Sequence, residues 1–493
     1  MIEQLPLINL LLLLGMALII PLFKKRSFSR TLIMGFVVLI AVIASSIVIL
    51  YHVSTHGDIH YLFGGHESFI GIEFVVNSFS AFFTLFVICL ATLVYWYSCG
   101  DATEGIEEKE YGRYYILLFI LLFSMFGILY TNDLFNTYVF IEILSITTCS
   151  IISIKRKKET YTAAFRYVML NEIGSLSYLF GVALLYMITG YTNMDLVAGR
   201  LQEIWHLYPT NIIIAIGFMI IGLGIKAAIF PFHIWLPDAH SSAPSTSSAI
   251  LSAIVVKVYL LILVKVLFKV FGIEIIGALN VDVILMVIAG VGMIMGSIFA
   301  IAQKDIKRML GYSSVAQIGY IVLGIGLMSA LGLQAAFFHI ISHGMMKAVL
   351  FLAVGIIIYH KKIRKINEMN GLGFQMPITM GIFSIAAFGM IGIPLTSGFI
   401  SKLYLGLAVL EKQQIVFIVV IVLSGLLNIL YYMPIIISAF LKDNKDKQRI
   451  TTVEKIPKTM LLPVVILGIL ILILGVYPNL ILGLIEAAVQ SIL

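Results

Sequence analysis

A lysine and a proline interrupt the apolar run Gly222-Leu-Gly-Ile-Lys226-Ala-Ala-Ile-Phe-Pro231-Phe. The same elements recur in the opposite order in Gly389-Met-Ile-Gly-Ile-Pro394-Leu-Thr-Ser-Gly-Phe-Ile-Ser-Lys402. Proline removes a backbone hydrogen-bond donor and breaks a helix. Irregular backbone at membrane depth is tolerated only where it is buried in protein or lines a water-filled cavity. The two stretches therefore predict two broken helices inside a membrane-spanning bundle.

Apolar runs of about twenty residues, the length that crosses a bilayer, recur on both sides of these stretches. The 493 residues are 61% hydrophobic and 12% charged, whereas soluble domains are about 45–50% apolar and about 25% charged. This composition excludes a soluble multidomain enzyme, a disordered chain, a disulfide scaffold and a nucleic-acid-binding module. The continuous runs also exclude a β-barrel, whose strands alternate apolar and polar residues. The sequence predicts an all-α polytopic membrane protein that forms a single transmembrane domain over residues 1–493.

Polar breaks divide the chain into about fourteen spans. Their centres lie near residues 14, 42, 87, 122, 144, 177, 220, 258, 290, 318, 346, 390, 426 and 472. Alternate loops carry basic clusters, as cytoplasmic loops do: Lys24, Lys25, Arg26 and Arg30; Lys155, Arg156, Lys157 and Lys158; Lys304, Lys307 and Arg308; Lys361, Lys362, Arg364 and Lys365; Lys442, Lys445, Lys447, Arg449, Lys455 and Lys458. These clusters account for most of the net charge of +7 without an anionic partner. An even number of spans places both termini outside the cell.

The first apolar run, Leu5–Leu22, is followed by basic residues and has no small-residue cleavage site. We therefore expect a first transmembrane helix and not a removable signal peptide. The three cysteines, Cys89, Cys99 and Cys149, are too few and too scattered for a metal or disulfide framework.

The order of lysine and proline in the two broken spans is informative. By the topology above, the span with Lys226 runs inward and the span with Lys402 runs outward. An opposite order in oppositely directed spans is what an inverted repeat predicts. Paired broken helices in corresponding positions point to a transport site. Two ordinary proline kinks are the alternative interpretation.

Ionisable residues inside the apolar spans are the second unusual feature, because each costs about 2.5–3.5 kcal/mol on insertion scales. They are Glu142, Glu172, Lys226, Lys257, Lys265, Lys347, Lys402, His233, His240, His339 and His343. A hydrated path through the bundle explains the whole set. Glu142 has apolar neighbours along the chain, and Lys226 is its expected partner, since a nearby lysine favours the ionised carboxylate. A static ion pair is the alternative.

His339, His343 and Lys347 follow one another at intervals of four and therefore share one helical face. Histidines at this spacing also bind zinc, but no acidic or cysteine ligand accompanies them, so a water-lined proton relay is favoured. A structural role is the other alternative. Lys257 is placed to pass protons from Lys226 toward the histidines, and Lys402 is expected to be the terminal site facing outside.

The polar segment from Trp235 to Lys257 begins Trp-Leu-Pro-Asp-Ala-His240-Ser-Ser-Ala-Pro and is expected to lie between two spans. Its side chains can satisfy backbone groups that are freed at a helix break. We include His240 in the relay. A loop with an N-cap serine is the alternative.

Together these motifs resemble the antiporter-like proton-translocating subunits of three assemblies. The assemblies are the multisubunit Na+/H+ antiporter (Mrp type), respiratory complex I and the membrane-bound hydrogenases. The resemblance covers nearly the whole chain, most strongly residues 75–440, and is greatest toward the D subunit of the Mrp antiporter. It is carried by Phe-Ile-Glu142-Ile, Gly-Ile-Lys226-Ala-Ala-Ile-Phe-Pro231, Trp235-Leu-Pro-Asp-Ala-His240, Val-Lys257, His339-x3-His343-x3-Lys347 and Pro394-Leu-Thr-Ser-Gly-Phe-Ile-Ser-Lys402.

The resemblance implies about 14 transmembrane helices with two inverted five-helix repeats and broken helices 7 and 12. The repeats would span residues 114–271 and 278–440, with peripheral helices 1–3 and 14. It also implies that Glu142, Lys226, Lys257 and Lys402 are the functional residues of helices five, seven, eight and twelve. No long lateral helix follows span fourteen, so the largest complex I subunit type and the extended A subunit of the antiporter are not expected.

The resemblance further implies a proton-translocating subunit of a Na+/H+ antiporter in the cell membrane. Its partners would be a homologous antiporter-like subunit and small hydrophobic membrane subunits, with H+ and Na+ as the ions. Two alternatives are a pumping subunit of a redox-driven complex (membrane-bound hydrogenase or complex I) and a freestanding transporter. The sequence has no flavin, haem, iron–sulfur or nickel ligation pattern, so no cofactor, metal or catalytic centre is expected in this chain. It leaves the roles of Glu172 and Lys265 open.

Overall fold

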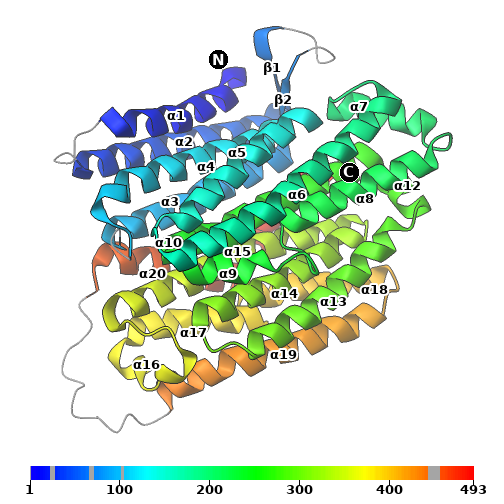
Figure 1. Cartoon of the computed structure of the whole chain (residues 1–493). Helices are drawn as coiled ribbons and strands as arrows, with labels where there is room; N and C mark the ends of the chain where they lie inside the picture. The colour runs from blue at the N-terminus through cyan, green and yellow to red at the C-terminus, as the bar shows by residue number, and fades with distance from the viewer. Residues whose placement is uncertain (1, 23–27, 66–70, 102–104, 442–455) are drawn as a thin grey trace.

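The computed structural model describes residues 2–22, 28–65, 71–101, 105–441 and 456–493. Nearly all of the described chain is helical (Figure 1). The helices are α1 (Leu5–Ile19), α2 (Phe28–His56), α3 (Ser78–Asp101), α4 (Tyr111–Tyr130), α5 (Leu134–Ser153), α6 (Lys158–Thr189), α7 (Met194–Ile204), α8 (Pro209–Lys226), α9 (Trp235–Ser242), α10 (Ser245–Ile250), α11 (Val256–Val264), α12 (Gly272–Ala278), α13 (Val281–Ile301), α14 (Ile306–Gly326), α15 (Ala330–Lys361), α16 (Leu372–Gln375), α17 (Pro377–Ile391), α18 (Ser397–Glu411), α19 (Val416–Phe440), α20 (Lys458–Val476) and α21 (Asn479–Gln490). A single antiparallel hairpin pairs β1 (Ile59–Leu62) with β2 (Glu73–Val76) in the described residues.

The helix lengths confirm the predicted all-α polytopic class. Within the described residues, 13 helices are long and apolar enough to cross a membrane. The predicted twelfth span is not among them because it is divided into α17 and α18, each 15 residues long. Apart from this division, a membrane-crossing helix covers every predicted span centre. Basic residues Lys24, Lys25, Arg26, Lys442, Lys445, Lys447, Arg449 and Lys455 of the predicted loops lie outside the described residues.

The broken seventh span is also present. Helix α8 ends at Lys226, and the chain turns through residues 227–234 before α9 begins at Trp235. As expected, the first part of the polar segment lies between two spans: α9 stands between α8 and the span Ser245–Ala278, and its His240 is fully buried. The serines that follow begin α10, where they are also buried. The alternative of a loop is wrong, because α9 and α10 are helical, and inside the bundle a helix pairs its own backbone groups.

The eighth span contains two π-helical turns that no sequence pattern predicted. They are Leu251–Val255 and Lys265–Phe271, on either side of α11. Short π-helical segments occur mostly as local bulges and are frequent at functional sites. This span and α15 are buried throughout their most apolar stretches, whereas α2 and α19 have the smallest shares of buried residues among the described spans. Figure 1 places α10 and α15 in the middle of the bundle, with α2 and α19 toward opposite edges.

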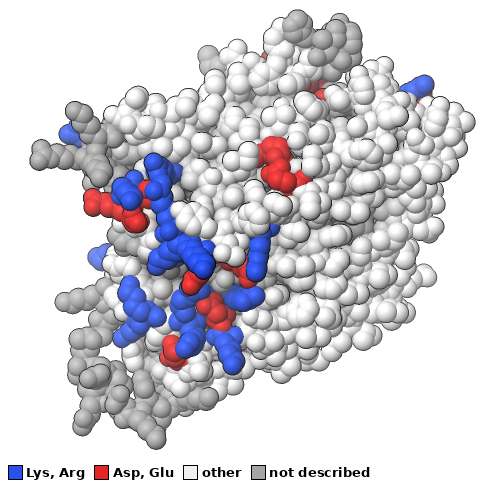
Figure 2. Space-filling model, in the orientation of Figure 1, with Lys and Arg blue, Asp and Glu red and all other residues white. Residues whose placement is uncertain are grey.

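Charge is concentrated at one end of the bundle, here called the basic end (Figure 2). Basic residues of three predicted inner loops, together with Arg166 of α6, line two neighbouring pockets there, which contain Lys155, Lys157, Lys158, Arg166, Lys307, Lys362 and Arg364. Asp238 of α9 forms ion pairs with Arg166 at 2.5 Å and with Arg308 at 3.1 Å. The hairpin, α7 and α12 lie at the other end, here called the hairpin end (Figure 1). This separation is typical of a protein whose basic loops share one side of a membrane.

Glycines allow α6 and α8 to pack with their backbones nearly touching. A Cβ on Gly222 would lie 2.6 Å from the carbonyl oxygen of Gly174 and 2.7 Å from the backbone nitrogen of Tyr178. Small residues permit this close approach of transmembrane helices. Because backbone atoms on the facing helix cannot rotate away, any larger residue at position 222 must separate the two helices.

We expect Gly222→Leu to destabilise the protein by about 1–3 kcal/mol, the usual cost of overpacking. The measurement is the thermal unfolding midpoint of the detergent-solubilised complex. Gly217→Leu is the matched control on the same helix, because a Cβ there meets no atom within 4 Å. Equal midpoints for the two variants would contradict this account of the α6–α8 contact.

Candidate functional site

Glu142 and Lys226 form an ion pair across α5 and α8. Their Oε1 and Nζ atoms are 3.7 Å apart, and the same Nζ donates to Ser145 Oγ at 2.5 Å. Lys226 is buried, whereas the Glu142 side chain is 19% exposed. Glu172 of α6 lies beside Glu142, and Figure 2 shows an isolated acidic patch on the uncharged face over these helices. The pair therefore reaches from the bundle interior to its lateral surface.

Hydroxyl groups continue from this pair toward the eighth span. Ser145 Oγ lies 3.3 Å from the hydroxyl of Tyr259 on α11, two residues after Lys257. Lys257 is buried and donates to the carbonyl oxygen of Ser252 in the first π-helical turn. The Ser252 hydroxyl lies 2.8 Å from that of Ser314 on α14. Buried hydroxyls of this kind both donate and accept, so they can pass a proton between neighbours.

Lys347 continues the row on the other side of α14. Its Nζ donates to the Leu310 carbonyl oxygen at 2.7 Å and to the Ser313 hydroxyl. Ser313 is the chain neighbour of Ser314, which bonds to Ser252. The Lys347 Nζ also lies 6.0 Å from the centre of the Phe351 ring, against which the His240 ring packs at 4.7 Å. The structure therefore brings His240 and Lys347 to the same aromatic side chain.

The histidine stripe leads from Lys347 to the second break. His339 and His343 are stacked on α15 with ring centres 5.8 Å apart. His339 Nδ1 lies 2.8 Å from Ser401 Oγ, and its ring centre is 5.5 Å from that of Tyr320. Lys402, the next residue after Ser401, places its Nζ 4.8 Å from the centre of the same tyrosine ring. The sequence spacing predicted the stripe, and α18 provides its continuation.

Lys402 is held at the break in the twelfth span. Its Nζ donates to the carbonyl oxygens of Met390 at 2.7 Å and Ile391 at 2.9 Å. These are the last residues of α17, where helix carbonyls have no partner within the helix. Gly392 follows with a φ of +95°, a conformation suited to glycine. The broken helix thus creates the oxygen site that the lysine occupies.

Several buried nitrogens along this row have no partner among the described residues. Both ring nitrogens of His240 and of His343 are buried without a hydrogen bond, as is Nε2 of His339. The side-chain nitrogen and oxygen of Gln317 on α14 are also buried without a hydrogen bond. Buried polar atoms are normally paired with protein or with ordered water. The row therefore favours a hydrated interior over a dry apolar core.

No sequence pattern indicated the groups that connect the charged residues. They are Ser145, Ser252, Ser313, Ser314, Tyr259, Gln317, Tyr320 and Ser401. Serine and tyrosine are common in membrane helices, so their presence alone carries little information. Proximity in sequence to a charged residue of a span could have identified three of these hydroxyl groups. Ser145 is three residues after Glu142, Tyr259 is two after Lys257, and Ser401 is one before Lys402.

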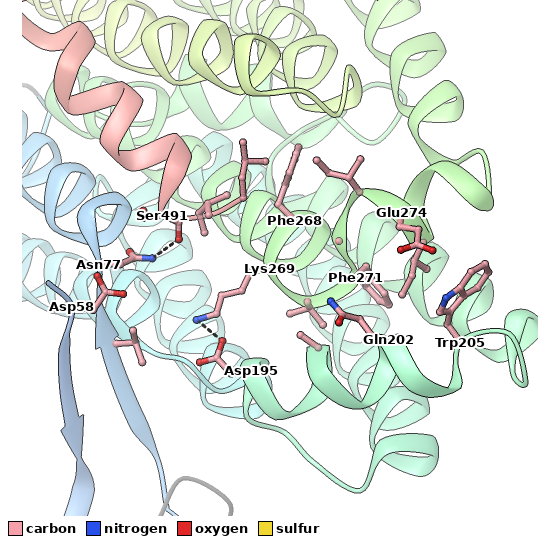
Figure 3. Close-up of a pocket in the computed structure, with 18 of the residues that line it drawn as sticks. Asp58, Asn77, Asp195, Gln202, Trp205, Phe268, Lys269, Phe271, Glu274 and Ser491 are labelled. Carbon is pink, nitrogen blue, oxygen red and sulfur yellow. Dashed lines mark hydrogen bonds and ion pairs between the residues drawn. The ribbon is translucent and has the colours of Figure 1, made fainter.

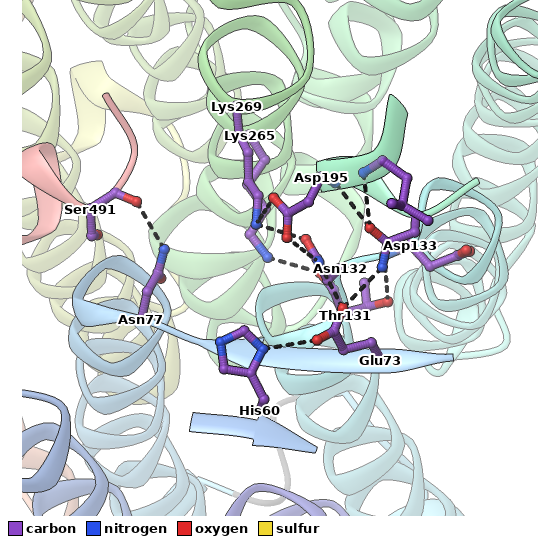
Figure 4. A network of polar contacts seen from close by, with 12 residues as sticks. His60, Glu73, Asn77, Thr131, Asn132, Asp133, Asp195, Lys265, Lys269 and Ser491 are labelled. Carbon is purple, nitrogen blue, oxygen red and sulfur yellow. Dashed lines mark hydrogen bonds and ion pairs between the residues drawn. The ribbon is translucent and has the colours of Figure 1, made fainter. Parts of the chain in front are cut away.

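A separate network of polar contacts lies at the hairpin end of the bundle (Figure 4). Glu73 of β2 accepts from Asn132 at 3.2 Å and Asn193 at 3.0 Å, and His60 Nδ1 lies 2.8 Å from its other oxygen. Burial favours the protonated acid, but the hydrogen bonds from His60, Asn132 and Asn193 outweigh it and lower the pKa of Glu73 below its ordinary value of 4.5. The ionised carboxylate therefore ties the hairpin to the α4–α5 loop and to the start of α7.

The lowered pKa predicts that Glu73 stabilises the hairpin above about pH 4.5, and that this contribution disappears as the pH falls through its pKa. We expect Glu73→Gln to lower the thermal unfolding midpoint at pH 7. The difference from the wild type should shrink as the pH is lowered past 4.5. Glu203→Gln, at an exposed carboxylate on α7, is the control and should show no such trend. A difference that is constant with pH would rule out this role for the charge.

Comparison with known proteins assigns the chain to a family. Residues 131–428 match the family described as NADH:quinone oxidoreductase/Mrp antiporter, TM. The chain is 36% identical to the N subunit of the NADH-quinone oxidoreductase of Desulforudis audaxviator, over 93% of this chain and 94% of that protein. It is 30% identical to the D subunit of the Na(+)/H(+) antiporter of Alkalihalophilus pseudofirmus, over 92% and 90%.

Solved structures have the same fold. A chain of the Mrp complex from Dietzia sp. superposes with a TM-score of 0.89 at 24% identity, covering 100% of this chain and 97% of that one. A chain of the membrane-bound sulfane sulfur reductase, an archaeal respiratory membrane complex, gives 0.87 at 26% identity, covering 100% and 96%. The family match covers more than half of the chain, and two relatives align over nine-tenths of it. The chain is a multi-pass membrane protein and belongs to the NADH:quinone oxidoreductase/Mrp antiporter family.

Proposed function

We propose that this chain is the proton-translocating membrane subunit of a multisubunit Na+/H+ antiporter. The observation that carries the proposal is the row of buried lysines and histidines, ending at the half-buried Lys402, that hydroxyls join between the two helix breaks. Four lysines, Lys226, Lys257, Lys347 and Lys402, lie on it, and only Lys226 has a carboxylate within 4 Å among the described residues. Buried lysines without a fixed counter-charge are costly, so a role that needs their charge explains their presence.

Each lysine has two useful states. As an ammonium it donates to the oxygens that surround it, and as an amine it can accept the next proton. In a low-dielectric interior, the charge at one lysine acts strongly on its neighbours. A proton arriving at Lys226 strengthens the pair with Glu142, and its departure releases that carboxylate. Protons then pass by way of Lys257, His240, Lys347, His343 and His339 to Lys402.

Orientation is part of the proposal. The basic end is placed in the cytoplasm of a cell membrane, because basic loops remain on that side. The hairpin end, which includes Asn77 and Ser491 in hydrogen-bond contact, then faces outward together with both termini. Two inverted repeats, residues 114–271 and 278–440, would relate the break after Lys226 to the break before Lys402.

A redox-driven complex is the second candidate. It is favoured by the 36% identity to the N subunit of an NADH-quinone oxidoreductase, against 30% to the D subunit of the antiporter. The same residues would then move protons, but electron transfer in other subunits would drive them. The fold is shared with a chain of the sulfane sulfur reductase, a respiratory complex, nearly as closely as with a chain of the Mrp complex, so it is compatible with both candidates.

Isolation of the intact complex distinguishes the two candidates. We expect a tagged chain, solubilised gently, to co-purify with small hydrophobic membrane subunits and a larger homologue, as identified by mass spectrometry. Inside-out vesicles should then show proton flux that depends on Na+ and not on an electron donor. Co-purifying iron–sulfur, flavin or nickel–iron subunits, with flux driven by an electron donor, would exclude the antiporter and establish the alternative. A stable, active chain without partners would exclude both.

A further inference from the structure

We propose that the pocket at the hairpin end is the aqueous mouth of a proton path, and that Lys265 is the proton station behind it. The pocket has a volume of about 780 Å³. It lies between the hairpin, α7, the second π-helical turn and α12, and Figure 3 shows Lys269 and Asp195 in contact at its wall. This inference rests on the proposed proton translocation and extends it to a lysine that the row described above does not include.

The mouth is lined by polar groups. Asp58, Asn77, Asp195, Gln202 and Lys269 all border the pocket. Burial raises the pKa of Asp58 above its ordinary value, whereas His60 and Lys269 oppose that shift. A cavity of this size with several polar side chains holds water, because water requires two to four polar partners. The wall can therefore exchange protons with the outer solution.

An ion pair separates the pocket from the deeper lysine. Lys269 Nζ lies 2.9 Å from Asp195 Oδ1 and donates to Asn132 Oδ1 at 2.7 Å. Asn132 in turn donates to Asp195 Oδ2 at 2.7 Å. These three side chains form a closed ring, visible in Figure 4. Lys269 and Asp195 reach solvent, with side chains 18% and 53% exposed, so the ring can open toward the pocket.

Lys265 lies one helical turn behind this ring on the same face. It is buried, and its Nζ donates to the carbonyl oxygens of Leu129 at 2.7 Å and Thr131 at 3.1 Å. Thr131 is the chain neighbour of Asn132, so the ring and the lysine share one loop. Within the described residues, no carboxylate lies within 4 Å of Lys265.

The surroundings of Lys265 match those of the proposed relay lysines. Lys257, Lys347 and Lys402 also place Nζ on main-chain carbonyl oxygens without a carboxylate. The carbonyl oxygens of such a site accept hydrogen bonds from the lysine both as a charged ammonium and as a neutral amine. Lys265 also follows Lys257 by eight residues along one helical span, about 12 Å at 1.5 Å per residue. Lys265 therefore lies between Lys257 and the pocket.

The proposed step is a simple transfer. The Lys265 ammonium gives one proton to water in the pocket when the ring of Lys269, Asp195 and Asn132 opens, and becomes a neutral amine. A proton from the direction of Lys257 restores the ammonium. The charged groups that act on Lys265 from the packed elements are Lys269 on its own helix and Asp195 on α7. A static role, in which Lys265 only holds the end of α4, is the alternative to be tested.

Lys265→Arg separates the two roles, because arginine keeps the charge and the donors but does not release its proton. In vesicles containing the intact complex, we expect Lys265→Arg to lose proton flux by about a hundredfold. Lys265→His should retain flux, with its dependence on outer pH moved in the acidic direction, because histidine titrates near 6.5 and lysine near 10.4. Wild-type flux in Lys265→Arg, or an unchanged pH profile in Lys265→His, would overturn the proposal.

Thiol labelling tests the mouth itself. Cys89, Cys99 and Cys149 are first replaced by serine, and a membrane-impermeant cationic methanethiosulfonate is added to one side. We expect Lys269→Cys and Lys265→Cys to react from the hairpin side only, whereas Val266→Cys, a buried neighbour, should not react. Reaction of Lys269→Cys without reaction of Lys265→Cys would overturn the path.

The variant Lys226→Ala, measured in the same vesicles, distinguishes failure of this inference from failure of the proposed function. If the proton flux of Lys226→Ala is normal, proton translocation along the whole row is wrong, and not only the role of Lys265.

Discussion

Lys226→Ala is expected to reduce proton flux through the intact complex by about a hundredfold or more, the range over which a positioned proton donor contributes. The lysine is the only buried group that joins the Glu142 carboxylate to the hydroxyl of Ser145 in the described chain. Alanine removes both contacts and leaves no titratable group at the end of α8. The measurement is fluorescence quenching of a pH dye in inside-out vesicles, with complex content measured in the same membranes.

Two further variants assign the loss to proton transfer. Lys226→Arg keeps the charge beside Glu142 but does not release its proton, so it should be as inactive as Lys226→Ala. Glu142→Gln should retain assembly and lose most of the flux. Lys412→Ala is the control, because that lysine is exposed and contributes to no part of the row. Normal flux in Lys226→Ala, with normal complex content, would eliminate the relay.

The second large effect is expected at the other break, where Lys402→Met should also reduce the flux by about a hundredfold. Methionine has a similar length and fills the space, but it cannot donate to the carbonyl oxygens of Met390 and Ile391. It also removes the cation beside the Tyr320 ring. Protons reaching His339 would then have no acceptor at the end of the row.

The Lys402→Met experiment needs a test for structural damage. The Met390 carbonyl oxygen keeps the hydrogen bond from Asn428, but the Ile391 carbonyl oxygen loses its lysine donor. An unpaired buried group costs about 1–3 kcal/mol, so the complex should unfold at a lower temperature yet remain assembled. Lys402→Arg restores donors to those carbonyls and should recover the unfolding midpoint without recovering the flux. Recovery of both by arginine would mean that Lys402 holds the helix end and carries no proton. Lys412→Met is again the control.

Much of the candidate site could be predicted from particular residues. Lys226 and Lys402 were identifiable because each lies close to a proline in an apolar run. The histidine stripe followed from its spacing of four on one helix. The partner of Glu142 followed from charge, and the pair is present at 3.7 Å. The connecting serines and tyrosines could not be predicted, because they matter only through contacts between residues that are up to 114 positions apart.

The helical structure of the polar segment after Trp235 could not be predicted from its composition. Its serines and prolines have the composition of a loop, but the bundle buries it as α9 and α10. Local composition describes what a segment prefers in water, whereas a buried segment must pair its backbone groups within itself. The π-helical turns beside Lys257 and Lys265 were likewise invisible in the sequence, because no residue type marks them.

The amino-acid sequence by itself determined the membrane class, the positions of the spans, the two breaks and the identity of the buried charges. These properties follow from apolar length, proline and charge, which act locally along the chain. Only the tertiary structure decided which oxygens each lysine contacts, that Glu142 opens to the lateral surface, and that Lys265 lies behind a pocket. Those contacts join helices distant in sequence, and helix packing alone sets which side chains meet.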